Sequence, residues 1–421
     1  MVPNGWNKRK LTSLCDKIAV GLAISVTPYM ANSGVKLIRN QNIKRNYFNT
    51  KSVVYITDEF AAKNNSKRVY AGDVVAVRTG SNIGEACVVP DEFDGALTFT
   101  TLIARPKNDE LISDYLSTHI NSEYGIAEVQ RLMAGGGKPN LNSGELKNYT
   151  LLTPPLPEQR KIAKTLSTWD KAISTTEKLI ETSKQQKKAL MQQLLTGKKR
   201  LRSLPEDGAE TGKVFEGQWK EVKLSHLFDR MTEKNKGQST NVVTISAQHG
   251  LIRQQEFFKK SVASETLDNY FILRKGQFAY NKSYSNGYPM GAIKRLNRYE
   301  DAVVTSLYIC FEIKDEAKTS SCFIEQYFES GLLNRGLTKV AAEGGRAHGL
   351  LNVKPSDFMG LSLVVPTFEE QQKIATVLTA ADKEIEVLEA KLSHFKQEKK
   401  ALMQQLLTGK RRVKIDEVEA A

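Results

Sequence analysis

The chain has 421 residues, and its 61 Lys and Arg against 47 Asp and Glu give a formal net charge of +14. This length allows two or more domains with cores of their own, and the positive charge favours a polyanionic partner, with nucleic acid as the first candidate. No apolar run is long enough for a membrane span or a signal peptide, and the four cysteines lack zinc-ligand spacing, so we expect a cytoplasmic protein.

Residues 1–155 show short β-type runs between loops that are rich in Gly, Asn, Ser and basic residues. The strand candidates are Val53–Ile56, Val74–Val77 and Ala86–Val89, and a helical stretch follows at 110–133. Such a mixture is typical of an α+β domain. We therefore expect a first globular α/β head.

A long helix is expected next, over 156–197. Pro157 is a good first-turn residue, and Gly197 supplies the C-terminal stop. The following residues, 198–215, are typical of a linker.

A second head is expected over 216–366. Its strand candidates are Val242–Ile245, Gln277–Tyr280 and Val303–Phe311, and helical stretches follow at 318–340.

A second long helix is expected over 367–409. Thr367 stands three residues before Glu370, which is the capping-box spacing, and Gly409 supplies the stop. Residues 410–421 form a tail that is first basic and then acidic.

The two halves are an internal repeat. Residues 187–198 read KKALMQQLLTGK, and residues 399–410 repeat the same letters at an offset of 212. At the front of each half the offset becomes 213, which carries Trp6 onto Trp219. The head sequences between these markers differ sharply, so we expect the helices to share one task and the heads to perform two.

Each helix carries an apolar seam with alternating steps of four and three, which predicts a coiled coil. Lys187 and Lys399 interrupt the seam at matching places, where a polar residue can fix the register. The alternative is two amphipathic helices, each packed on its own head. Pairing of two related modules favours a two-fold axis and hence antiparallel helices. A second apolar row would then be free to dock helices of another protein; it consists of Leu179, Met191, Leu195, Val377, Val387, Met403 and Leu407.

The loops of both heads carry side chains that suit DNA. Arg, Lys, Asn and Gln can read base edges, and Lys, Ser and Thr suit phosphates. A single loop residue of these types is more often merely solvated, and the recurrence of the loops in both heads is the stronger signal. The candidates in the first head are Arg39, Asn40, Gln41, Lys44, Arg45, Arg78, Thr79, Ser81, Asn82, Lys138 and Asn140. Those in the second head are Gln248, His249, Arg253, Gln254, Asn281, Lys282, Ser283, Tyr284, Asn286, Arg346 and His348.

Signals for catalysis are weak. The glycines at 135–137 and 344–345 lack the GxGxxG spacing, and the histidines show no metal-ligand spacing. Glu221-Val222-Lys223 imitates the ExK of a metal-dependent nuclease, with Asp207 upstream, but the first half has Lys8-Arg9-Lys10 in its place. We expect no catalytic residue, no metal site and no cofactor bound by this chain.

Several motifs resemble the specificity subunit (HsdS) of type I restriction–modification systems, and the resemblance covers the full chain. They are PLPEQRKIA at 155–163, FEEQQKIA at 368–375, KGQFAYNK at 275–282 and the two LMQQLLTGK endings. The fold that it implies is α+β, with two α/β target-recognition domains, two long helices in an antiparallel coiled coil and a pseudo-two-fold internal repeat.

The resemblance also implies a function and partners. Each head would read one half of a split double-stranded DNA site, while the helices set the spacing and bind two methyltransferase subunits. Those partners would hold S-adenosylmethionine for adenine N6 methylation, and motor-nuclease subunits would cleave the DNA. The alternatives are a coiled-coil structural adaptor with nonspecific nucleic-acid-binding heads and, third, a divergent nuclease around Glu221.

Overall fold

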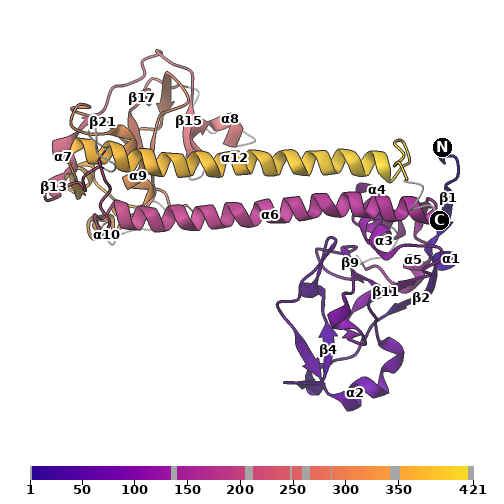
Figure 1. The fold of residues 1–421 in the computed structure, drawn as a ribbon. Coiled ribbons are helices and arrows are strands. Elements are labelled where there is room, and N and C mark those ends of the chain that lie inside the picture. Colours follow the sequence, from indigo (N-terminus) through magenta and orange to yellow (C-terminus); the bar gives the residue numbers. More distant parts are fainter. Residues whose placement is uncertain are drawn as a thin grey trace. The chain divides into compact units, whose positions relative to one another are not determined.

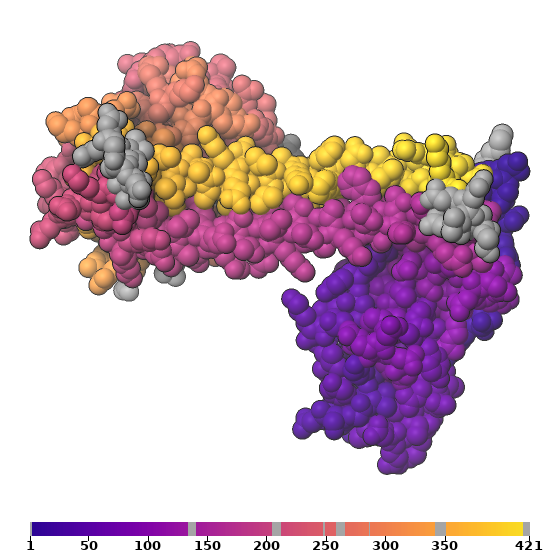
Figure 2. All heavy atoms as spheres, viewed as in Figure 1, coloured from indigo at the N-terminus to yellow at the C-terminus, as the bar shows by residue number. Residues whose placement is uncertain are grey.

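The computed structural model describes residues 2–133, 140–203, 212–246, 249–257, 266–285, 287–341 and 351–415; the others are grey in Figures 1 and 2. The chain forms two compact units: unit 1 is Met1–Lys178 with Ala390–Ala421, and unit 2 is Leu179–Glu389. Each unit contains one head, which we call head 1 (1–155) or head 2 (216–366). Each also contains parts of two long helices, α6 (Leu156–Leu194) and α12 (Phe368–Leu406). The expected six-part division into heads, helices, linker and tail stays a prediction.

Head 1 is built on an antiparallel sheet with the strand order β2-β11-β8-β9. Alternate residues of β8 point into different cores, since Val74 and Ala76 join one apolar cluster and Val75 and Val77 another. The sheet is therefore covered on both faces. Its strands are β2 (Cys15–Val20), β11 (Thr101–Pro106), β8 (Val74–Val77) and β9 (Ala86–Val88).

Further strands complete head 1. They are β1 (Asn7–Lys10) paired with β12 (Thr150–Thr153), the hairpin β5 (Ile43–Lys44) and β6 (Tyr47–Phe48), and a sheet of β10 (Leu97–Thr98), β4 (Val35–Ile38), β7 (Val54–Ile56) and β3 (Met30–Ala31).

The helices of head 1 connect the sheet to the long helices. Figure 1 shows α3 (Ser113–Ile120), α4 (Glu123–Met133) and α5 (Ser143–Lys147) on the side of head 1 that faces α6, whereas α2 (Asp58–Lys63) lies farther from it. The short α1 (Leu11–Leu14) precedes β2. Tyr115 and Leu116 of α3 share one core with Ile162 and Leu166 of α6 and Leu406 of α12. Head 1 thus packs on the start of α6 and on the end of α12.

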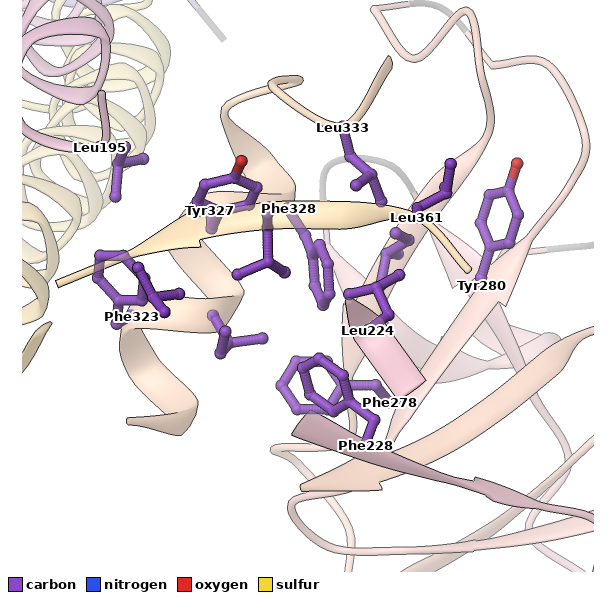
Figure 3. Close-up of a cluster of buried hydrophobic side chains, with 14 of the residues drawn as sticks. Leu195, Leu224, Phe228, Phe278, Tyr280, Phe323, Tyr327, Phe328, Leu333 and Leu361 are labelled. Atoms are coloured by element: carbon purple, nitrogen blue, oxygen red, sulfur yellow. The ribbon is translucent and has the colours of Figure 1, made fainter. Parts of the chain in front are cut away.

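Head 2 has a sheet of the same order, β14-β21-β18-β19, in a different sequence. Its core is aromatic: the rings of Phe228, Phe278, Phe311 and Phe328 contact one another. Leu195, which directly follows α6, belongs to the same buried cluster and lies at its edge, away from Phe228 and Phe278 (Figure 3). The four strands are β14 (Phe228–Met231), β21 (Ile309–Ile313), β18 (Phe278–Asn281) and β19 (Ala292–Arg295).

The remaining elements of head 2 pair locally. The strand pairs are β13 (Lys220–Lys223) with β22 (Ser362–Val365), β15 (Val243–Ser246) with β16 (Gly250–Arg253), and β17 (Phe271–Arg274) with β20 (Asp301–Val304). The helices are α7 (Leu224–Leu227), α8 (Gln254–Phe257), α9 (Ser321–Glu329), α10 (Asn334–Val340) and α11 (Pro355–Met359).

The α+β class is confirmed, and one predicted strand is wrong. The run Val303–Phe311 was expected as a single strand, but β20 ends at Val304 and β21 begins at Ile309, in two different sheets. The backbone turns between them, where Tyr308 N–H donates to the carbonyl of Thr305. No helix in the described ranges is long and apolar enough to cross a membrane.

In unit 1 the parts of α6 and α12 run antiparallel and are joined by charge pairs. Lys399 Nζ donates to Asp170, and Lys396 lies 2.7 Å from Glu177, so the residue numbers rise on one helix as they fall on the other. Lys399, the expected polar interruption of the seam, is only 14% exposed. A nearly buried ammonium group needs a charge partner, and Asp170 of the other helix provides it.

Unit 2 contains the same pairs at an offset of 212 residues. Lys187 donates to Asp382, and Lys184 lies 2.5 Å from Glu389. Lys187 is 15% exposed. Gln326 of α9 donates its amide to the second oxygen of Asp382, at 2.7 Å, and so connects head 2 to this pair.

The start of each long helix is held by a buried glutamate. Glu158 of α6 accepts from Arg412, and Glu370 of α12 accepts two hydrogen bonds from Arg200, at 2.7 and 2.8 Å. The position that follows, Gln159 or Gln371, caps a neighbouring loop; Gln371, for example, accepts from the backbone N–H of Ser320. These contacts give both residues of the Glu-Gln pair at each helix start a structural role.

The second apolar row is mostly occupied by the chain's own heads. Met191, Leu195 and Leu407 are buried in the cores of the units, while Leu179 and Val387 are exposed. Val377 and Met403 are half-buried against those cores, so Leu179 and Val387 are the exposed members of the expected docking row.

We expect Glu370→Gln to lower the free energy of unfolding of unit 2 by about 3 kcal/mol, because it leaves the Arg200 guanidinium without its carboxylate. Glu369→Gln is the matched control, since Glu369 is exposed, and it should change stability by less than about 0.5 kcal/mol. Urea unfolding measures both. Equal effects of the two variants would contradict the assigned role of Glu370.

We expect head 1 to lose stability in mild acid because of His119. Burial lowers the pKa of its imidazole from 6.5 to about 4, and its Nδ1 lies 2.7 Å from the Tyr149 hydroxyl. The unfolded chain binds a proton near pH 6.5 and the folded chain does not, so stability is complete above that pH and falls by about 3 kcal/mol toward pH 4. Urea unfolding at pH 7 and pH 4 measures this loss of unfolding free energy, and we expect the loss to be smaller by that amount in His119→Asn than in the wild type. Equal losses in the two proteins would refute the assignment to His119.

Candidate nucleic-acid interface

The first candidate loop of head 1 is a tight turn after β4. Asn42 is fully buried, and its side chain accepts from the backbone N–H of Arg39, which closes a 3₁₀ turn over Asn40–Asn42. Two polar atoms in this turn, Arg39 Nε and Asn40 Oδ1, are buried without a hydrogen-bond partner. Such atoms are rare in folded proteins. Gln41 beside them is exposed.

The hairpin β5–β6 follows directly and presents Lys44 and Arg45. Its turn depends on Asn46, whose φ of 53° lies in the left-handed region that Asn tolerates. The Asn46 side chain accepts hydrogen bonds from Asn121, at 2.7 Å, and from Ser117, at 3.0 Å, and these bonds anchor the turn to α3. The tip is therefore fixed while Lys44, Arg45 and the neighbouring Tyr47 remain exposed.

Sequence reasoning missed Asn46 and Tyr47. An Asn between a basic residue and an aromatic residue is a turn signal that could have located the hairpin. The anchoring partner Asn121 is 75 residues away, and no local pattern indicates it.

The loop after β8 brings two distant candidates together. Arg78 Nε donates to Asn140 Oδ1 at 3.0 Å, and Thr79 forms a backbone bridge with Asn140. Thr79, Ser81 and Asn82 are exposed on the turn that follows. Lys138 lies outside the described residues.

In head 2, one candidate group lies around the hairpin β15–β16. His249 is exposed in its turn, and Arg253 donates to Asn241 at 3.1 Å and lies over the ring of Tyr299. Gln254 Oε1 is buried without a partner. Gln248 lies outside the described residues.

The other group follows β18. Asn281 accepts from the backbone N–H of Ser283 at 3.0 Å, Lys282 points to the carbonyl of Val353, and Tyr284 is exposed. Asn286, Arg346 and His348 lie outside the described residues. Because β8 and β18 hold the same place in the two core sheets, the loops after them leave the two heads from equivalent positions.

Metal-ligand groups and two of the cysteines can be assessed in the described residues. The described residues contain no group of three or more His, Cys, Asp or Glu that could hold a metal ion. Burial raises the pKa of the Cys87 and Cys310 thiols to about 12, which keeps them protonated and poor nucleophiles. Glu221 and Lys223 are exposed on β13, and Asp207 lies outside the described residues. The exposed groups in both heads are hydrogen-bond donors, acceptors and cations, which suit binding.

Comparison with known proteins gives related sequences. Residues 3–184 match the type I restriction modification DNA specificity domain. The chain is 26% identical over 398 residues to the type I restriction enzyme MjaVIII specificity subunit of Methanocaldococcus jannaschii, with 87% of each protein covered. It is 22% identical over 427 residues to the putative type I restriction enzyme MjaX specificity subunit of the same organism, with 98% of this chain and 95% of that one covered. The expected resemblance to specificity subunits is confirmed.

Solved structures share the fold. A crystal structure of a type I restriction–modification S subunit from M. genitalium gives a TM-score of 0.57 at 15% identity and covers 97% of this chain and 98% of that one. A chain from a study of complex assembly and conformational transition of the type I system gives 0.55 at 15% identity and covers 98% and 100%. At such identities the likeness concerns the fold.

Proposed function

Because residues 3–184 match the type I restriction modification DNA specificity domain, we propose that this chain is the non-catalytic DNA-recognition subunit of a type I restriction–modification complex. One observation carries the proposal. The two heads have core sheets of the same strand order, but the polar side chains on the loops around these sheets differ. A shared scaffold with different contact residues is what recognition of two different DNA sequences requires.

Each head reads one half of a bipartite double-stranded DNA site in this proposal. Arg39 and Asn40 in head 1 and Gln254 in head 2 support it, since each is a half-exposed polar side chain at a candidate contact segment. Arg pairs with guanine, and Asn or Gln with adenine, through hydrogen bonds at base edges in the major groove. Because the two sets of side chains differ, the two half-sites differ in sequence.

The long helices set the spacing between the half-sites. Each has 39 residues, which corresponds to about 58 Å at ~1.5 Å per residue. We propose that α6 and α12 pair along this length as one antiparallel coiled coil, with the seam pairs Lys187–Asp382 and Lys399–Asp170 fixing its register. At ~3.4 Å per base pair the helices then limit the separation to about 17 base pairs.

The chemistry belongs to partner subunits. Two methyltransferase subunits would bind the helices, hold S-adenosylmethionine and methylate adenine N6, and motor-nuclease subunits would cleave DNA. The partner helices would dock at Leu179 and Val387, which are exposed apolar side chains of the long helices. No membrane takes part in this proposal.

Selection from a random DNA library with the full-length chain tests the proposal. We expect the enriched sequences to share two short constant tracts separated by a gap of fixed length. One continuous tract would refute the bipartite reading. Salt-dependent binding without any sequence preference would instead favour the structural adaptor with nonspecific heads.

Single substitutions should then alter only one tract. We expect Arg39→Ala to relax the preference at a base of the head 1 tract by about 1–3 kcal/mol, and Gln254→Ala to do the same in the other tract. Lys51→Ala is the control, since Lys51 is exposed in head 1 and lies outside the candidate set. Competition binding with singly mutated sites measures the change. Relaxation of both tracts by one substitution would contradict independent heads.

A further inference from the structure

Unit 1 contains a hollow of about 260 Å³ between head 1 and the C-terminal part of α12, which we call the α12 hollow. On the head side it is lined by Arg45 of the hairpin turn and by Tyr124 of α4. On the other side it is lined by Lys396, Lys400 and Gln404 of α12. All of these residues belong to unit 1.

We propose that the α12 hollow binds a phosphate of the DNA backbone beside the half-site that head 1 reads. The inference rests on the proposed function and adds a sequence-independent contact made by a long helix. Arg45 connects the candidate interface of head 1 with the α12 hollow, since its side chain belongs to the first and lines the second. DNA that touches the hairpin tip therefore comes within reach of the α12 lysines.

The charge of the hollow suits a phosphate. Four cations line it, namely Arg45, Lys396, Lys399 and Lys400, against the single carboxylate of Glu123. A lysine ammonium is a compact charge with three donors, which suits phosphate oxygens better than base edges.

The lysines have partners, but these are weak competitors. Lys396 lies 2.7 Å from Glu177 and Lys400 2.7 Å from Glu123, and the two lysine side chains are 54% and 62% exposed. Exposed ion pairs of this kind are weak, because water screens the attraction between the two charges. An ammonium group with three donors can turn to a phosphate at little cost. Lys399, in contrast, is nearly buried against Asp170 and keeps its role in the seam.

The size of the hollow also favours a small group. A volume of 260 Å³ is slightly below the ~300–1,000 Å³ of typical small-molecule pockets, and it does not accommodate a helix of a partner subunit. A single phosphate with its water molecules fits.

Unit 2 provides a natural comparison. It has a hollow of about 970 Å³ lined by Lys184, Lys187 and Lys188, which hold the same helix positions as Lys396, Lys399 and Lys400. Lys294, Arg295 and Arg298 also line this hollow, so that it has six cations, and five carboxylates almost cancel their charge. The carboxylates are Glu325, Glu329, Asp382, Glu386 and Glu389. The same lysine pattern thus lies in two different electrostatic surroundings, and only that of unit 1 favours an anion.

The test uses the full-length chain and the double variant Lys396→Gln/Lys400→Gln. We expect it to weaken binding by the same factor for specific and random DNA, and to reduce the slope of log K against log salt by about 1 to 2 units. The matched control is Lys184→Gln/Lys188→Gln, whose slope should equal that of the wild type. Lys396→Arg/Lys400→Arg, which keeps the charge, should retain the wild-type slope.

An unchanged slope in the first variant would overturn the inference, and so would equal reductions in both glutamine variants. Thermal melting of each variant shows whether the fold is intact. The inference and the proposed function fail separately. If the wild type shows no sequence preference, the recognition role is wrong, whereas the difference in slope between the two glutamine variants still reports on the hollow.

Discussion

The ion pair between a nearly buried lysine and an aspartate of the other long helix is the contact on which helix pairing depends in each unit. A purely apolar seam tolerates displacement of one helix by a heptad, because each apolar residue then meets another. A lysine that is only 14–15% exposed does not, because without its aspartate the charge stays largely out of water and loses its partner. Lys187–Asp382 and Lys399–Asp170 therefore specify one register in unit 2 and in unit 1.

A fixed helix register leaves the heads free to differ. Both retain the same four-strand order, but the side chains that brace the sheet have changed. In head 1, Asp73 accepts two hydrogen bonds from Arg105, both at 2.8 Å. In head 2, Gln277 directly precedes β18 as Asp73 directly precedes β8, and it donates to Glu312 at 2.8 Å. An ion pair and a neutral-to-charged hydrogen bond thus support the same strands, so the backbone scaffold does not dictate the chemistry of the loops around it.

The sequence predicted the features that local patterns determine. Helix caps located both long helices to within a few residues, and β-type runs located strands such as Val74–Val77 correctly. Contacts between distant residues were not predictable. The seam lysines were recognised but not Asp170 or Asp382, and Val303–Phe311 seemed to be one strand because its turn has no Gly or Pro. In the candidate interface, exposed loop residues were identifiable by type, whereas the buried anchor between Asn46 and Asn121 depends on the fold.

The two helices also show that identical letters need not have identical surroundings. KKALMQQLLTGK occurs in both, and both copies place a lysine against an aspartate of the other helix. In unit 2, Gln326 of head 2 joins this pair by donating to Asp382. In unit 1, among the described residues, head 1 donates no such hydrogen bond to Asp170. The helix sequence determines how the helices pair, whereas each head determines the charge around the exposed lysines of its unit. A duplicated helix can therefore keep one structural task in both units and still contribute differently to binding in each.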